Sequence, residues 1–258
     1  MNQKVNKVSA IQKALGILDC FSLEKVELGI TEIAKIIGFG KSTIYPIVKT
    51  LEKNRYLKQS NENKKYSLGL KIIERAYILL EQMDIRKISL PFLTELSKKY
   101  KENVHLAVLD GQDAVYIEKF ENAPPLGIRS QVGKRVSLHN TALGKVLLAF
   151  LSEEKINNII QNINLEKTTP NTVTDPSELK SHLTQVKKAG YAIDNEEHQI
   201  GGMCFGSPIF DRTGKAIAGF SISIPIVRMN KDKLETIIED LVKTSKEISA
   251  CFGYKTEQ

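Results

Sequence analysis

Residues 29–57, GITEIAKIIGFGKSTIYPIVKTLEKNRYL, carry the clearest apolar pattern of the chain. The pattern predicts a short helix with Thr31 as N-cap, since a threonine hydroxyl can accept an amide of the first turn. Gly38 and Gly40 then predict a tight turn. A second helix is predicted over residues 41–54, because its apolar residues have the i, i+3, i+4, i+7 spacing of one helix face: Ile44, Ile47, Val48 and Leu51.

The opposite face of this second helix is polar, with Ser42, Pro46, Lys49 and Lys53. A short helix, a glycine turn and a helix with a polar outer face are typical of a helix-turn-helix, whose second helix enters the major groove of DNA. An ordinary helical hairpin with a solvated outer face is the alternative for this stretch alone.

Short elements on both sides complete the predicted module. Residues 9–21 form an amphipathic helix, and residues 56–58 and 66–68 form a hairpin around the turn SNENKK. Lys64 and Lys65 lie near its tip, where they either contact phosphates or face solvent. Residues 70–83 predict a helix with an apolar row that packs on its own domain or pairs two subunits: Leu70, Ile73, Tyr77 and Leu80.

The rest of the chain mixes helices and strands. Helices are predicted over 91–100, 141–151, 174–190 and 231–252, and strands over 104–109, 114–120, 203–210 and 216–224. Hairpins with helices between them imply an antiparallel sheet covered by helices, so the predicted fold class is α+β.

Charge separates the two parts of the chain. Residues 1–65 hold 12 Lys+Arg and 6 Asp+Glu, whereas the other 193 residues hold 25 and 24. A basic module attached to a near-neutral remainder is expected of a DNA-binding protein. No apolar run is long enough to span a bilayer and the N-terminus lacks a signal-peptide core, so we expect a cytoplasmic protein without membrane contact.

The strand AIAGFSISIP offers a binding surface. Side chains alternate along a strand, so Gly219, Ser221 and Ser223 share one face, which lines either a polar hollow or a solvent-exposed sheet surface. The helix start near residues 140–143 presents free amides that favour an anion.

Cysteine and histidine chemistry is the remaining alternative. Cys204 and His198 are close in sequence, and a Cys/His pair can be nucleophilic, yet no nucleophile elbow, phosphate loop or recognisable acid pair accompanies them. A redox-sensing Cys204 would need a low pKa and an accessible thiol. The three cysteines and four histidines show no ligand spacing, so we expect no metal, no cofactor and no enzymatic activity.

Several segments together resemble the IclR family of bacterial transcriptional regulators, in the family's order: SAIQKALGILDCF, GKSTIYPIVKTLEKNRYL, YSLGLKI, SLHNTALGKVLLAFL, GYAIDNEEHQIGGMCFGSPIFD and AIAGFSISIP. The resemblance implies a winged helix-turn-helix over residues 1–69, a linker helix over 70–86 and a GAF-like effector domain over 87–258. It also implies a homodimer or homotetramer that binds a palindromic double-stranded DNA operator, and a small-molecule effector, often an organic acid or an aromatic compound.

The resemblance also supplies candidate residues. For effector binding they are Ile128, Ala142, Leu143, Asp194, Cys204, Ser221 and Ser223. The second helix of the motif and the wing themselves supply the candidate DNA-binding residues: Lys41, Ser42, Thr43, Tyr45, Lys49, Lys64 and Lys65. Asp194 suits an anionic ligand poorly, so it orients a ligand hydroxyl or holds a loop. Pro46 stands where the family commonly has Arg, and we expect the helix to start late, with Ser42 as cap, or to bend there. The reading is a regulator, most simply a repressor, controlled by an organic acid, with redox control through Cys204 as the alternative.

Overall fold

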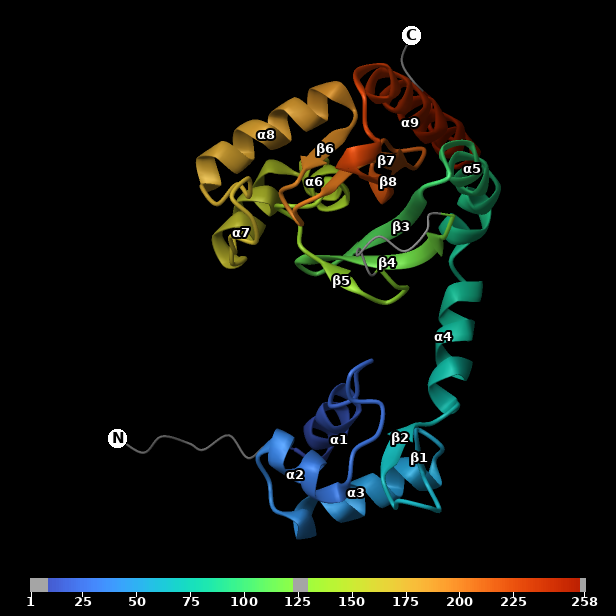
Figure 1. The fold of residues 1–258 in the computed structure, drawn as a ribbon, viewed down its shortest axis with the longest axis vertical. Helices are drawn as coiled ribbons and strands as arrows, with labels where there is room; N and C mark the ends of the chain where they lie inside the picture. Colours follow the sequence, from blue (N-terminus) through green and yellow to red (C-terminus); the bar gives the residue numbers. More distant parts are fainter. Residues whose placement is uncertain (1–8, 123–129, 256–258) are drawn as a thin grey trace. The chain divides into compact units, whose positions relative to one another are not determined.

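The computed structural model describes residues 9–122 and 130–255, which belong to two compact units, Met1–Gln82 and Met83–Gln258. The first unit is a winged helix-turn-helix, as predicted (Figure 1). It contains α1 (Ala10–Asp19), α2 (Ile30–Ile37), α3 (Lys41–Lys53), the antiparallel wing strands β1 (Leu57–Gln59) and β2 (Tyr66–Leu68), and α4 (Lys71–Glu81). Its core joins the three helices to the wing through Ile17, Ile33, Ile44, Val48, Leu57 and Tyr66.

The two helices of the motif begin at glycines. The N-cap of α2 is Gly29 and not Thr31, because the Glu32 carboxylate reaches back to accept the Gly29 amide at 2.7 Å. The N-cap of α3 is Gly40 and not Ser42, since the Gly40 carbonyl accepts the Thr43 and Ile44 amides. Both helices therefore start one or two residues before the predicted hydroxyl caps.

Of the two expectations for Pro46, a late start of α3 is wrong, whereas a bend at this residue stays a prediction. The helix begins at Lys41 and continues through Pro46, its sixth residue. Pro46 has no amide to donate to the Ser42 carbonyl, but both residues are exposed, so water can serve that carbonyl. The Thr50 hydroxyl in turn donates to the Pro46 carbonyl at 2.8 Å.

The helix α4 has no buried residue, and its apolar row is largely open, with Tyr77 64% exposed. After Gln82 and Met83 the chain enters α5 (Asp84–Tyr100), which begins seven residues before the predicted start and contains Pro91. The segment 70–86 therefore holds α4 and the first residues of α5.

A six-stranded antiparallel sheet forms the centre of the second unit, in the order β5-β4-β3-β8-β7-β6. The strands are β3 (Asn103–Asp110), β4 (Asp113–Phe120), β5 (Arg135–Val136), β6 (Ala192–Asn195), β7 (Gly202–Phe210) and β8 (Ala216–Pro225). The four predicted strands are present. The edge strands β5 and β6 were not predicted, because strands this short do not show a clear alternation of apolar and polar residues.

Helices cover both faces of this sheet, which confirms the α+β class (Figure 1). One face packs on α6 (Ala142–Ala149), α7 (Glu153–Asn162) and α8 (Pro176–Ala189), whereas the other packs on α5 and α9 (Lys231–Cys251), which the short helix η1 (Ile226–Arg228) precedes. No helix in the described part of the chain is long and apolar enough to cross a membrane.

Candidate functional site

The strand β8 divides its side chains between two environments. Phe220, Ile222 and Ile224 are fully buried in the core on the α5–α9 face. Ser221 and Ser223 point to the opposite face, where α6 lies. The predicted alternation of this strand is therefore present.

Strand pairing gathers polar side chains from distant parts of the sequence. The register places Asp194 beside Cys204 and Cys204 beside Ser223, across β6, β7 and β8. A second row pairs Ser221 of β8 with Gly206 of β7 and with His105 of β3. Together the two rows form a polar floor of the sheet.

The start of α6 lies directly against this floor. Thr141 is its N-cap and accepts the Gly144 amide at 2.9 Å. A Cβ atom on Gly206 would lie 2.8 Å from the Ala142 carbonyl oxygen, so glycine permits the close approach of helix and strand. The first amides of the helix consequently border the sheet at this point.

A pocket lies between α6 and the floor and is partly open to solvent, with a cavity volume of about 40 Å³. Six of the seven predicted effector residues line it: Ala142, Leu143, Asp194, Cys204, Ser221 and Ser223. The seventh, Ile128, lies outside the described residues. The remaining lining residues are His105, Tyr116, Ser130, Lys134, Val136, Thr141, His198, Gln199 and Gly202.

Asp194 holds the connection between β6 and β7. Its Oδ1 atom accepts the amide of Glu197 at 2.8 Å and that of His198 at 3.2 Å. Burial raises the pKa of this carboxyl group to about 6, and the two amide hydrogen bonds limit the rise. Of the two roles considered for Asp194 from sequence, the structure shows the one in which it orders a loop.

Cys204 lies in an environment that suppresses thiolate chemistry. Burial, together with the negative charge of Asp194, raises the pKa of its thiol to about 12. The thiol donates to Ser223 Oγ at 3.2 Å. A redox-sensing cysteine needs the opposite shift, so this geometry does not favour the redox alternative.

His105 is a pocket residue that sequence reasoning missed. Its Nε2 atom lies 2.6 Å from Ser130 Oγ, its ring contacts that of Tyr116, and its Nδ1 atom is buried without a hydrogen-bond partner in the described part of the chain. Burial lowers the pKa of the imidazole to about 3, so it is neutral. Only the pairing of β3 with β8, which the sequence does not reveal, places it beside Ser221.

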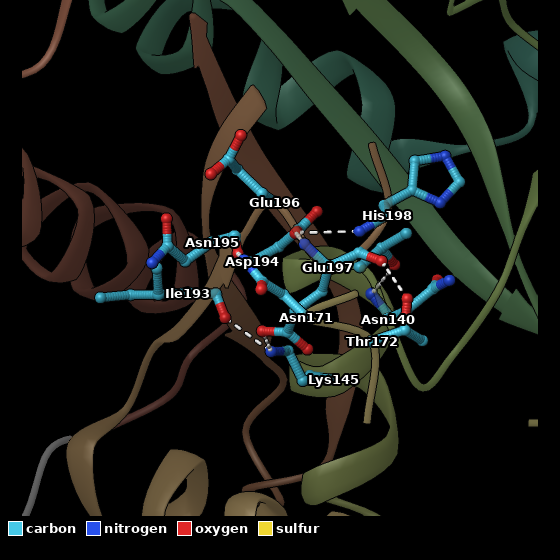
Figure 2. Close-up of polar contacts among 12 residues, drawn as sticks. Asn140, Lys145, Asn171, Thr172, Ile193, Asp194, Asn195, Glu196, Glu197 and His198 are labelled. Carbon is cyan, nitrogen blue, oxygen red and sulfur yellow. Dashed lines mark hydrogen bonds and ion pairs between the residues drawn. The ribbon is translucent and has the colours of Figure 1, made fainter. Parts of the chain in front are cut away.

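A buried ion pair lies behind the pocket (Figure 2). Lys145 of α6 donates from Nζ to Glu197 Oε1 and to the Ile193 carbonyl, both at 2.6 Å. The Glu197 carbonyl accepts hydroxyl groups from Thr168, Thr169 and Thr172. The sequence signal for this pair is a lone lysine in the otherwise apolar helix ALGKVLLA.

The first unit presents a separate polar surface on α3. Lys41, Ser42, Thr43 and Tyr45 are exposed at its N-terminal half, where recognition helices contact bases. The first turn of α3 carries no acidic side chain, so the positive end of the helix dipole can interact with an anion outside the helix. This is the surface that the sequence predicts for DNA.

The remaining predicted DNA residues are partly paired. Lys49 forms an ion pair with Glu52 on the same helix, which raises its pKa through a side-chain hydrogen bond. Lys64 is exposed at the wing, and Lys65 is half-buried with Nζ 3.8 Å from Glu32 Oε2. These are exposed pairs of small energy, which a phosphate can replace.

Comparison with known proteins agrees with both units. The IclR helix-turn-helix domain matches residues 10–61, and the C-terminal domain of IclR bacterial transcriptional regulators matches residues 78–250. The transcriptional regulator XynR of Escherichia coli is 36% identical over 96% of this chain and 98% of its own.

Solved structures share the fold. The crystal structure of Thermotoga maritima IclR is 36% identical, with a TM-score of 0.79 over 95% of this chain and 98% of that one. An IclR homologue from Microbacterium hydrocarbonoxydans, complexed with 4-hydroxybenzoate, has a TM-score of 0.84 and is 22% identical. The match covers 95% of this chain and 99% of that one.

Proposed function

The chain belongs to the IclR family of bacterial transcriptional regulators, and from that premise we propose that it is a repressor released by a small hydroxylated carboxylic acid. The acid would bind in the pocket between α6 and the sheet. The polar lining of that pocket is the observation that carries the proposal.

The pocket chemistry supports this class of ligand. The lining combines hydroxyl, imidazole, thiol, amide, ammonium and carboxyl groups with an apolar part that includes Val136, Ala142 and Leu143. Such a combination suits a small acid whose hydroxyl and carboxylate groups form hydrogen bonds and whose carbon skeleton meets the apolar part.

Charge suggests how the acid would lie. Asp194 is an acidic group, so the ligand carboxylate would point away from it, toward the first amides of α6 and the hydroxyls of Ser221 and Ser223. A ligand hydroxyl would then face Asp194. Leu143 would contact the carbon skeleton.

The operator side of the proposal uses the surface of α3 and the wing. The proposed DNA contacts are Lys41, Ser42, Thr43, Tyr45, Lys49, Lys64 and Lys65. Specific binding needs two half-sites, and the exposed row of α4 would pair two copies of the chain in the cytoplasm. Effector and operator would each weaken the binding of the other, as linkage requires.

Replacing Ser221 and Ser223 together with alanine tests the ligand site. Removing two hydroxyls that bind a charged group should weaken binding tenfold or more, since each such hydrogen bond contributes about 1.5–3 kcal/mol. The ligand is first selected by thermal shift from hydroxylated carboxylic acids and 4-hydroxybenzoate, and is then titrated by calorimetry.

Ser245→Ala is the matched control, because Ser245 is a buried serine on α9 whose hydroxyl donates to the Pro208 carbonyl. It should leave ligand affinity unchanged, and DNA binding without ligand should survive in all variants. Unchanged affinity in the double variant would refute the site. Stabilisation by none of these acids would refute the ligand class.

A further inference from the structure

The pocket has two walls that come from different parts of the chain. Thr141, Ala142 and Leu143 of α6 form one wall. The other contains Asp194 of β6 and, from the connection that follows it (residues 196–201), His198 and Gln199. The shape of the pocket therefore depends on what holds this connection against the helix.

Lys145 joins the two walls directly. Its side chain, 4% exposed, leaves α6 one turn after Ala142 and ends at the Ile193 carbonyl and the Glu197 carboxylate. Figure 2 shows the ammonium group between these two acceptors, with Asp194 beyond Glu197. One helix side chain thus binds both β6 and the start of the connection that follows it.

We propose that Lys145 is a positioning residue of the pocket, which holds residues 196–201 in the arrangement that a ligand meets. This inference rests on the proposed function only in treating the pocket as the effector site. The ligand does not touch Lys145, which acts through Glu197 and His198.

The electrostatics of Glu197 give the reason. Its side chain is 10% exposed, and its Oε2 atom has no hydrogen-bond partner among the described residues. Lys145 is its ion-pair partner, and a buried carboxylate that loses its partner is strongly destabilised. Without the ammonium group, Glu197 would turn toward water.

That movement would reach the pocket through the backbone. The amides of Glu197 and His198 donate to Asp194 Oδ1, and threonine hydroxyls hold the Glu197 carbonyl. If the backbone follows the turned side chain against these contacts, the two amide hydrogen bonds open more often and His198 shifts in the lining. Cys204 lies beside Asp194 in the register, and its thiol would become accessible.

Lys145→Met in the full chain, without effector, tests the proposal. Methionine keeps the length and apolar stem of lysine but removes the charge. Hydrogen exchange of the Glu197 and His198 amides should become at least tenfold faster. Labelling of Cys204 by iodoacetamide, resolved by mass spectrometry from Cys20 and Cys251, should accelerate similarly.

Leu241→Ala is the matched control for general destabilisation, because Leu241 is fully buried in the α9 core on the other face of the sheet. It should lower the melting temperature while changing both local rates by less than twofold. If Lys145→Met does not fold, Glu197→Gln, which keeps an oxygen for Lys145, should give a smaller acceleration in the same direction.

Local rates within twofold of wild type in the folded Lys145→Met variant, or equal to those of Leu241→Ala, would overturn the proposal. These measurements need no ligand. A failed search for an effector therefore does not affect this test. A negative result in the exchange test, in turn, does not affect the proposed effector site, which the titration of the serine variants tests.

Discussion

Replacing Asp194 with asparagine should stabilise the protein at neutral pH. The carboxyl group has a usual pKa of 3.8 and a folded-state pKa of about 6, which burial raises. The shift corresponds to about 3 kcal/mol of unfavourable free energy for the ionised form. Asparagine is neutral and keeps an oxygen for the amides of Glu197 and His198, so Asp194→Asn should gain about 1–3 kcal/mol at pH 7.5.

The sign of the pH dependence follows from proton binding. Between pH 3.8 and about 6 the folded state holds this proton more tightly than the unfolded state, so wild-type stability falls as pH rises through this window. Below pH 3.8 both states are protonated. The advantage of the asparagine variant should therefore shrink toward zero near pH 4 and stay constant above pH 7.

Urea unfolding of the full chain, followed by circular dichroism at half-unit steps from pH 4 to 8, measures this difference. Asp211→Asn is the control with the opposite sign, because a hydrogen bond from the Thr213 hydroxyl lowers the pKa of Asp211. Relative to wild type, that variant should be less stable by a deficit that develops as pH rises toward 3.8 and stays constant from pH 4 to 8. A pH-independent difference between Asp194→Asn and wild type, or a less stable variant at pH 7.5, would refute the reasoning.

Two further predictions concern DNA binding and assembly. Lys49→Ala should weaken binding to a genomically selected operator fragment and lower the salt slope of the affinity by about 1, because it removes one phosphate contact. Fluorescence anisotropy measures both effects, and wild-type behaviour would exclude Lys49 from the interface. The chain should scatter light as a dimer or larger at micromolar concentration, and Tyr77→Glu, which places a charge in the exposed row of α4, should shift it toward the monomer; a wild-type monomer would contradict the pairing.

Periodicity predicted the long elements of this fold and their faces. The alternation of β8 placed Ser221 opposite Phe220, and the 3.6-residue spacing of α3 placed Ile44 and Val48 in the core. These signals are local and repeat several times within one element. They gave the correct fold class without any knowledge of strand order.

Features that depend on partners distant in sequence were not predictable. The caps of α2 and α3 are a local exception: they lie at Gly29 and Gly40, where the Glu32 carboxylate accepts the Gly29 amide and the Gly40 carbonyl accepts the Thr43 and Ile44 amides. His105 became a pocket residue through its register with Ser221, and Lys145 forms an ion pair with a carboxylate 52 residues away. Neither pairing leaves a periodic trace in the sequence.

The two faces of β8 have different roles: one lines the pocket and the other packs in the core. Substitutions at Ser221 or Ser223 would change the lining of the proposed effector pocket, whereas Phe220, Ile222 and Ile224 are buried in the core on the α5–α9 side. Because neighbouring residues serve different faces, single substitutions can change ligand preference at little cost in folding. Such a strand lets related regulators diverge toward new metabolites while their scaffold stays the same.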